Sequence, residues 1–270
     1  MEYVQSLARP PLSRWVRAFW MLRSVGGGAG AAESVFPDGC VEIVLNLGDP
    51  FLHVPSSGTP AAQPAAMLVG PTTRPMRIAP SGAVDVVGIR FEPHGAPLGL
   101  QLPSEGLVDR ALPLAEVAAL RVGEWLERLA ASGDWRSRFR MLERELGAVL
   151  DVRRSDPLVE AASGIIGRSG GRVTVDRLSH ALGVRPRRLE RKFRAHVGMA
   201  PKKLCRITRF QRLLGELESG TLAGAAARCG YADQAHLTRD FRDFGGMTPA
   251  AFRNGDDVLP RLFAGRSVGD

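Results

Sequence analysis

The feature that most constrains the fold of this chain is an element that occurs twice in its last third. Seven residues of the first copy recur 48 positions later with the same identity. In the first copy they are Leu189, Arg191, Phe193, Arg194, Gly198, Met199 and Pro201, and in the second copy Leu237, Arg239, Phe241, Arg242, Gly246, Met247 and Pro249. Such a repeat indicates one supersecondary unit used twice.

Each copy has the pattern of a helix-turn-helix unit. A short helix rich in alanine and leucine is predicted over residues 175–182 in the first copy and 222–229 in the second. A glycine follows, Gly183 or Gly230, and glycine tolerates the positive φ that reverses a chain sharply. A second helix then begins, and Asp233 lies where its N-cap is expected in the second copy.

The second helix of each copy has one apolar face and one polar face. Leu189 and Phe193 are four residues apart and share the apolar face, as do Leu237 and Phe241 in the second copy. Phosphates attract arginine regardless of sequence, and a helix in the major groove can present Arg to guanine and Gln to adenine. The polar faces carry Arg187, Arg188, Arg191 and Arg194 in the first copy, and Gln234, His236, Arg239 and Arg242 in the second.

The net charge of +8 is concentrated in this region. Residues 160–254 hold 18 of the 36 Lys and Arg but only 8 of the 28 Asp and Glu, which leaves 18 basic and 20 acidic residues elsewhere. This asymmetry predicts a polyanion-binding domain joined to a domain with another task. Between the copies, apolar spacing predicts a helix over residues 201–218, roughly 25 Å long. Such a rod can hold two recognition helices about one DNA turn, roughly 34 Å, apart.

Residues 157–254 resemble the DNA-binding domain of the AraC/XylS family of bacterial transcription regulators. The likeness is carried by the run from Ala226 to Phe241 and by the following Gly246-Met247-Thr248-Pro249. The resemblance implies two helix-turn-helix units, joined by one helix, that enter successive major grooves of double-stranded DNA. It also leaves room for contacts with RNA polymerase and for a homodimer.

Carried over by position, the resemblance implies a role for ten side chains. Arg185 departs from the family pattern, which has Ser or Thr as an N-cap there, so we expect a weaker cap or an added phosphate contact at this position. The implied base-reading residues are Arg187, Glu190, Arg191, Gln234, His236 and Arg239, and the implied phosphate contacts are Arg185, Arg188, Arg194 and Arg242.

The first 112 residues have short β-type runs separated by Gly and Pro, which is typical of a sandwich or small barrel. Strands are predicted at residues 41–47, 67–69, 76–78 and 84–91, and residues 12–20 fit either a short amphipathic helix or a strand pair. From Leu114 to Val152 the apolar spacing predicts two antiparallel helices, broken at residues 132–134. Their apolar stripe either packs on the β domain or forms a dimer seam.

The N-terminal half resembles the cupin-like sensor or dimerisation domains that precede this DNA-binding domain in many family members. The likeness lies in residues 36–49, 69–71 and 88–93. We therefore expect an α+β protein with a cupin-like domain over residues 1–112 that binds a small-molecule effector or dimerises. A helical hairpin and linker (113–156), the double helix-turn-helix domain (157–254) and a loosely ordered tail (255–270) follow.

Other functions find little support in the sequence. His53 and His94 are 41 residues apart and lack the partners of a metal-binding cupin, and no catalytic motif is present, so we expect no metal, no cofactor and no enzyme activity. Cys40, Cys205 and Cys229 are read as buried hydrophobes. The rival hypothesis is an enzyme or alkyl-damage repair protein, with Cys40 as its reactive thiol, that carries a DNA-binding domain. Without a signal peptide or apolar span, the cytoplasm is the expected compartment.

Overall fold

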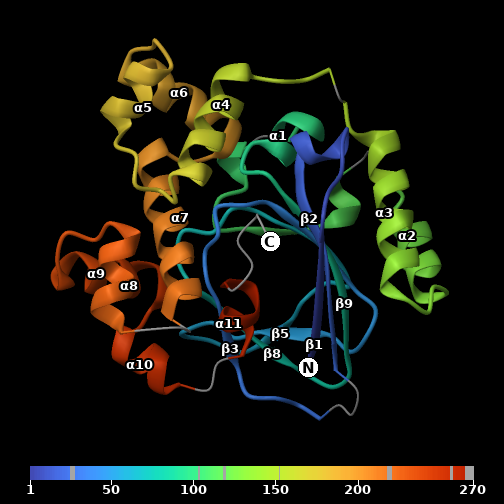
Figure 1. The fold of residues 1–270 in the computed structure, drawn as a ribbon. Coiled ribbons are helices and arrows are strands. Elements are labelled where there is room, and N and C mark those ends of the chain that lie inside the picture. Colours follow the sequence, from blue (N-terminus) through green and yellow to red (C-terminus); the bar gives the residue numbers. More distant parts are fainter. Residues whose placement is uncertain are drawn as a thin grey trace.

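The computed structural model describes residues 1–24, 28–102, 104–117, 120–151, 153–217, 221–255 and 258–264. Two parts follow one another along the chain, an antiparallel β domain and a helical domain (Figure 1). The predicted α+β class with two domains is confirmed. In the described ranges, no helix is both long enough and apolar enough to cross a membrane.

The β domain consists of two antiparallel sheets. The first contains, in spatial order, β1 (Glu2–Leu7), β2 (Val16–Ser24), β9 (Val84–Phe91), β4 (Glu42–Asn46), β7 (Ala66–Val69) and β10 (Ala111–Pro113). The second contains β3 (Glu33–Val35), β8 (Met76–Pro80), β5 (Phe51–His53) and β6 (Ala61–Ala62). The strands predicted at residues 41–47, 67–69, 76–78 and 84–91 are thus found as β4, β7, β8 and β9.

The start of the chain forms a strand pair, which is one of the two alternatives that the sequence left open. β1 and β2 pair antiparallel, with Tyr3 opposite Leu22, and a single 3-10 turn at Leu12–Arg14 lies between them. Pro10 and Pro11 precede this turn and cannot donate backbone hydrogen bonds, which disfavours a longer helix there.

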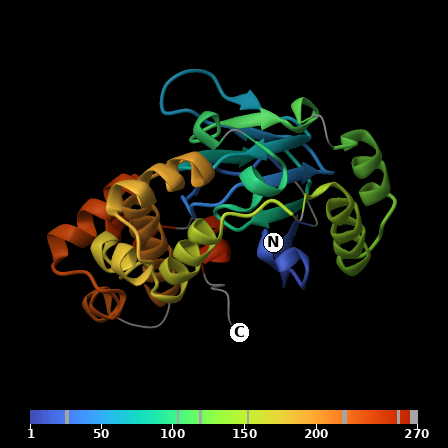
Figure 2. The same cartoon turned by 90° about the horizontal axis from the view of Figure 1, so that it is seen from above.

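One face of the first sheet is covered by helices α1 (Gly95–Gly99), α2 (Val122–Ala130) and α3 (Trp135–Val149) (Figure 2). The apolar side chains of α2 and α3 share a buried core with residues of the sheet, which confirms packing on the β domain and leaves a dimer seam untested. The first helix begins at Val122 and not at Leu114, because the chain is extended at Val117 after a 3-10 turn at Leu114–Glu116. The predicted end at Val152 lies outside the described residues.

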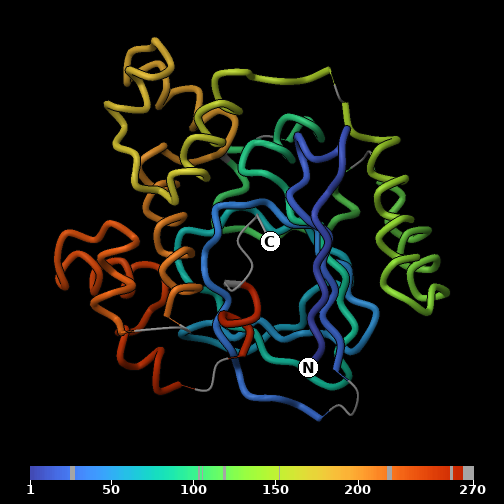
Figure 3. Tube along the Cα trace, in the orientation of Figure 1, coloured from blue at the N-terminus to red at the C-terminus, as the bar shows by residue number. Residues whose placement is uncertain are grey.

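The other face of the first sheet meets the second sheet around a cluster that we call the interior cluster. Its buried members are Tyr3, Trp20, Leu22, Phe51, Val84, Val86 and Leu259. Leu259 belongs to α11 (Leu259–Ala264), a helix near the C-terminus that packs against β3 and α7 and adds its apolar side chains to this cluster (Figures 1 and 3). The expectation of a loosely ordered tail is therefore wrong for residues 258–264, and residues 265–270 lie outside the described part.

The helical domain has its own core, built around one central helix. That helix, α7 (Pro201–Glu216), buries Leu204, Ile207, Phe210 and Leu213 among side chains from both helix-turn-helix units. The predicted helix end at Glu218 lies outside the described residues. The remaining helices are α4 (Pro157–Arg168), α5 (Val175–Ala181), α6 (Pro186–Val197), α8 (Leu222–Cys229), α9 (Gln234–Asp240) and α10 (Pro249–Asn254).

Candidate DNA-binding surface

The first helix-turn-helix unit consists of α5, a turn and α6. The hydroxyl of Thr174 accepts a hydrogen bond from the backbone N–H of Arg177 (3.3 Å) and caps α5. The turn contains Gly183 at φ 63°, a conformation that favours glycine. The side chain of Arg185, at the N-cap of α6, makes no capping hydrogen bond, as its departure from the family pattern predicts.

Side chains of opposite character lie on the two faces of α6. Leu189 and Phe193 are fully buried in the core of the helical domain, which confirms the predicted apolar face.

A buried carboxylate joins α6 to α4. Asp156 accepts a hydrogen bond from the backbone N–H of Val159 and lies 2.6 Å from the ammonium of Lys192. Burial alone would raise the pKa of Asp156, but the hydrogen bond from Lys192 and the backbone bond hold it below its usual value. This carboxylate therefore ties α4 to α6.

The second unit repeats the first with better capping. Thr221 caps α8 through the N–H of Gly224 (3.2 Å), and Gly230 reverses the chain at φ 78°. The carboxylate of Asp233 accepts a hydrogen bond from the backbone N–H of His236 (2.7 Å), so the predicted N-cap of α9 is confirmed. The helical path continues beyond α9 as a π-turn over Phe241–Gly245, which buries Phe241 and Phe244.

The connecting helix α7 holds α9 by ion pairs as well as by its core. The guanidinium of Arg206 lies 2.6 Å from Asp240, a fully buried carboxylate on α9, and 2.6 Å from Asp243. With 16 residues, α7 is about 24 Å long. The two units are thus joined through one rigid helix.

Nine of the ten predicted contact residues are exposed: Arg185, Arg187, Arg188, Glu190, Arg191, Arg194, Gln234, Arg239 and Arg242. Within the described ranges, none of these nine side chains forms a hydrogen bond or an ion pair with another side chain. Three arginines of the β domain differ, because Arg17, Arg90 and Arg138 are each paired with a carboxylate. Unpaired exposed guanidinium groups remain available to an external anion.

Two parts of the chain match known domain families. Residues 178–255 match the model of a helix-turn-helix domain, and residues 5–113 match that of a domain of unknown function (DUF6597). The helical domain is an AraC-type DNA-binding domain. The chain is therefore a DNA-binding transcription regulator with a C-terminal domain of this type.

Solved structures of ToxT from Vibrio cholerae are similar to the whole chain at low identity. One at 1.65 Å resolution has 10% identity and a TM-score of 0.49 over 100% of both chains. A complex of ToxT from strain O395 with (E)-4-(8-methylnaphthalen-1-yl)but-3-enoic acid has 11% identity and a TM-score of 0.48, over 97% of this chain and 100% of that chain. No curated protein matches the sequence significantly. With TM-scores below 0.5, the assignment to the AraC type rests on the domain match.

A cleft between the two units of the AraC-type domain adds residues that the sequence reasoning missed. It has a volume of about 560 Å³ and lies between the start of α5, one side of α7, and α9. Besides Arg239, it is lined by the cations Arg172, Lys202, Arg206 and Arg209, with Asp176 and Asp240 as its acidic members. The sequence did offer one signal for the cleft, namely the cations on the connecting helix. A cation there faces any ligand that contacts both units.

His236 is the predicted contact residue whose surroundings differ most from expectation. Its ring packs edge-on against Tyr231, with centroids 5.0 Å apart, and its Nε2 lies 3.3 Å from the guanidinium of Arg209. The side chain is half-buried. These contacts give His236 a packing role at the start of α9, and its predicted base contact stays a prediction.

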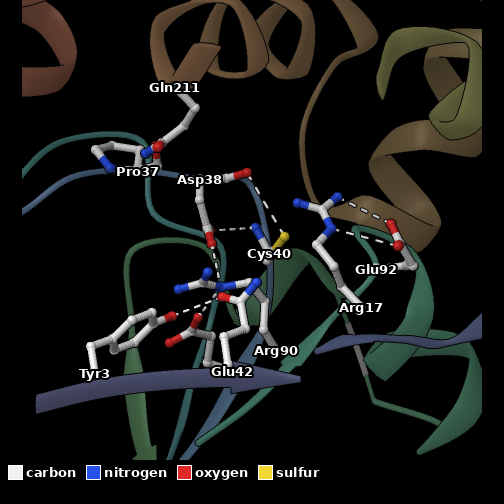
Figure 4. A network of polar contacts seen from close by, with 10 residues as sticks. Tyr3, Arg17, Pro37, Asp38, Cys40, Glu42, Arg90, Glu92 and Gln211 are labelled. Carbon is white, nitrogen blue, oxygen red and sulfur yellow. Dashed lines mark hydrogen bonds and ion pairs between the residues drawn. The ribbon is translucent and has the colours of Figure 1, made fainter. Parts of the chain in front are cut away.

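One of the places where the AraC-type domain and the β domain meet is residues 36–40, which we call the interface loop (Figure 4). Phe36 is 6% exposed and belongs to the helical core, 5.7 Å from the ring of Phe210 and 5.8 Å from that of Phe252. The carbonyl of Pro37 accepts a hydrogen bond from the Gln211 amide of α7 (2.6 Å). The next residue, Asp38, lies 3.0 Å from the guanidinium of Arg90 inside the β domain. The interface loop therefore connects the interior of the β domain to α7.

The remaining candidate groups of the sequence analysis are the cysteines and two histidines. The three cysteines are free and buried, and Cys205 on α7 lines the cleft. Burial raises the pKa of Cys40 well above its usual value. His53 is exposed on β5, whereas His94 is buried with its Nε2 3.1 Å from the carbonyl of Arg14. Among the residues that the structure describes, no cluster of three or more His, Cys, Asp or Glu could hold a metal ion.

Proposed function

We propose that this regulator reads an operator with both helix-turn-helix units at once, α6 in one major groove and α9 in the next. The observation that carries the proposal is the set of exposed, unpaired side chains on these two helices, joined by the rigid α7. In the proposed complex Arg187, Glu190, Arg191, Gln234, His236 and Arg239 read bases, and Arg185, Arg188, Arg194 and Arg242 bind phosphates.

The cleft between the units extends this proposal to the DNA backbone. When α6 and α9 enter two successive major grooves, the phosphates along the intervening minor groove lie between the two helices. Arg172 and Lys202 line the cleft, and both are exposed. We assign both to phosphate contacts that add affinity without adding sequence preference.

Gel-shift titrations at several salt concentrations test the separation of roles. For Arg239→Ala we expect a loss of discrimination between operator variants of about 1–3 kcal/mol. For Arg194→Ala we expect about equal weakening on all sequences and a salt slope smaller by about one. Arg140→Ala is the matched control, because Arg140 is an exposed cation on α3, far from α6 and α9 (Figure 1).

Unchanged relative affinities in Arg239→Ala would refute base reading by α9. Weakening by Arg140→Ala as large as that by Arg194→Ala would show that the assay reports net charge and not a defined contact.

We further propose that the β domain regulates the AraC-type domain through the interface loop. Phe36 and Pro37 contact α7 directly, and Asp38 belongs to the charged network of the interior. A small-molecule effector that shifts Arg90 or Asp38 would therefore act on the helix that sets the spacing of α6 and α9. Contacts with RNA polymerase and a homodimer are further proposals, tested by promoter transcription in vitro and by sedimentation.

The rival proposal of an alkyl-damage repair activity depends on Cys40. Its thiol is buried, and burial raises its pKa, so the thiol stays protonated near neutral pH. A reactive cysteine needs the thiolate, and this environment opposes it. Incubation of the full chain with alkylated DNA, followed by mass measurement of Cys40, separates the two proposals.

A further inference from the structure

The interior of the β domain is filled by a segment that comes from the far end of the chain. α11 follows the end of the matched helix-turn-helix domain at residue 255 and packs against β3 and α7, and its apolar side chains reach the interior cluster (Figure 3). Its first residue, Leu259, is 2% exposed and packs with Trp20 and Val86 of the interior cluster. Strand side chains alone therefore do not fill this space, and α11 completes the packing.

Phe263 makes the most specific contacts of this segment. Its ring lies edge-on to Tyr3, with centroids 5.4 Å apart, and 5.7 Å from the indole ring of Trp20. The guanidinium of Arg90 lies 5.8 Å from the centre of the same ring. The indole of Trp20 lies close over Gly88, where any side chain would collide with it. Tyr3, Trp20 and Arg90 thus form a site that holds one aromatic ring, that of Phe263.

Polar contacts hold the start and the middle of the segment. The carboxylate of Glu33 on β3 accepts hydrogen bonds from the backbone N–H groups of Val258 (2.8 Å) and Leu259 (2.7 Å). Arg261 donates to the carbonyls of Phe252 (2.9 Å) and Gly255 (3.0 Å), at the end of the AraC-type domain. The segment therefore bridges the β domain and the DNA-binding domain.

The length of α11 makes its order dependent on its contacts. It has six residues, and isolated helices shorter than about 12 residues are marginal in water. Its order consequently comes from its contacts with the interior cluster, with α7 and with Glu33. A competitor that takes over the contacts of Phe263 removes part of what orders the helix.

We propose that residues 258–264 are a displaceable internal ligand of the β domain, and that a neutral small molecule with an aromatic ring takes the same site. We infer an aromatic ring in the small molecule because Tyr3, Trp20 and Arg90 all contact the aromatic ring of Phe263. This inference deepens the proposed regulation by the β domain but does not depend on how DNA is read.

The charges around the site argue for a neutral ligand over an anion. Arg90 is already paired with two carboxylates, those of Glu42 and Asp38. Both flank the guanidinium that faces Phe263, so an anionic ligand would meet two acidic groups and one cation that is already satisfied. A ligand with a neutral ring keeps the cation–π contact with Arg90 and avoids this repulsion.

Hydrogen exchange of the full chain, read by mass spectrometry on the C-terminal peptide, tests the docking. We expect the amides of residues 258–264 to be protected in the wild type, and Phe263→Ala to exchange about tenfold faster or more, since it removes the aromatic contacts with Tyr3 and Trp20. Val258→Ala is the matched control, because Val258 is 41% exposed and contributes only its backbone to the contact with Glu33. Exchange in the wild type at the rate of an unstructured peptide would overturn the proposal.

Benzyl alcohol and benzoate are the probes for the ligand, because they share one ring and differ in charge. Benzyl alcohol should accelerate exchange of residues 258–264 in the wild type as its concentration rises, and should protect β1, β2 and β9. Acceleration in the wild type is decisive, because Phe263→Ala alone could bind the probe in an artificial cavity. No acceleration would overturn displacement, and benzoate acting as well as benzyl alcohol would overturn the charge argument.

Operator affinity keeps this inference separate from the proposed function. If Phe263→Ala changes the affinity of the full chain for its operator and Val258→Ala does not, the segment couples the two domains. If the exchange results hold and operator affinity is unchanged, the coupling is refuted. Loss of base discrimination in Arg239→Ala is measured independently of either result.

Discussion

Replacement of Arg206 by methionine tests how α9 is held in register with α7. Arg206 is 23% exposed and donates from Nε (3.0 Å) and Nη2 (2.6 Å) to one oxygen of Asp240, which is fully buried. Methionine keeps the apolar stem beside the ring of Phe244 but leaves the carboxylate of Asp240 without its cation. The buried charge then has no compensation from solvent.

The expected cost follows from these exposures. Removal of one partner of a buried ion pair costs about 3–5 kcal/mol, because the remaining charge is uncompensated. The second contact, to Asp243, adds little, since that carboxylate is 43% exposed and such pairs contribute roughly 0–1 kcal/mol. We therefore expect Arg206→Met to lower the free energy of unfolding of the helical domain by about 3–5 kcal/mol.

The double variant Arg206→Met with Asp240→Asn provides the internal control. The amide has the shape of the carboxylate without its charge, so the double variant should be more stable than Arg206→Met alone, with a coupling of about 2 kcal/mol. Urea unfolding followed by far-UV circular dichroism measures all members of this cycle. A cost for Arg206→Met below about 0.5 kcal/mol, the range of ordinary surface substitutions, would refute the reasoning. Strict additivity in the cycle would refute it equally.

Two further predictions concern the interface loop and the first unit. Phe36→Ala should lower the free energy of unfolding by about 3 kcal/mol or more, because the ring leaves a hole between Phe210 and Phe252; Leu7→Ala, at an exposed position, should cost much less, and equal costs would contradict the burial argument. Asp156→Asn should keep the cap of α4 but lose the pair with Lys192, at a cost of roughly 0.5–1 kcal/mol. Because the pKa of Asp156 is lowered in the folded protein, its stabilising effect is present above the usual aspartate pKa of about 4 and is lost as the pH falls through the lower folded value. Urea midpoints measured between neutral and acidic pH should therefore converge for the wild type and the variant, and a constant gap would contradict the assignment.

The helix-turn-helix units could be predicted closely because their signals are local. The predicted 222–229 helix is found at those bounds, and Asp233 caps α9 as expected. Glycine after the first helix, aspartate at the cap and two apolar residues four positions apart act within a few residues of one another. The structure that such local signals specify does not depend on contacts with distant parts of the chain.

The surroundings of His236 and the docking of α11 could not be predicted, because both depend on residues distant in sequence. His236 is held by Tyr231 and by Arg209, and the latter lies on the connecting helix. Phe263 meets Tyr3, 260 positions earlier, and a six-residue apolar stretch at a chain end shows no periodicity that would indicate this partner. The charge pattern located the DNA-binding domain but not the cleft, which exists only once α5, α7 and α9 are packed together.

The position of Phe36 has a consequence for how this regulator can be divided and recombined. A chimera that joins the β domain of another protein to residues 157–255 would leave Phe210 and Phe252 facing an empty space, so the grafted half would lose a piece of its own interior. Successful exchange of sensor modules should instead require that the donor supply an aromatic side chain at the place of Phe36. The inherited unit is thus the helical half together with one short loop that precedes it by more than a hundred residues.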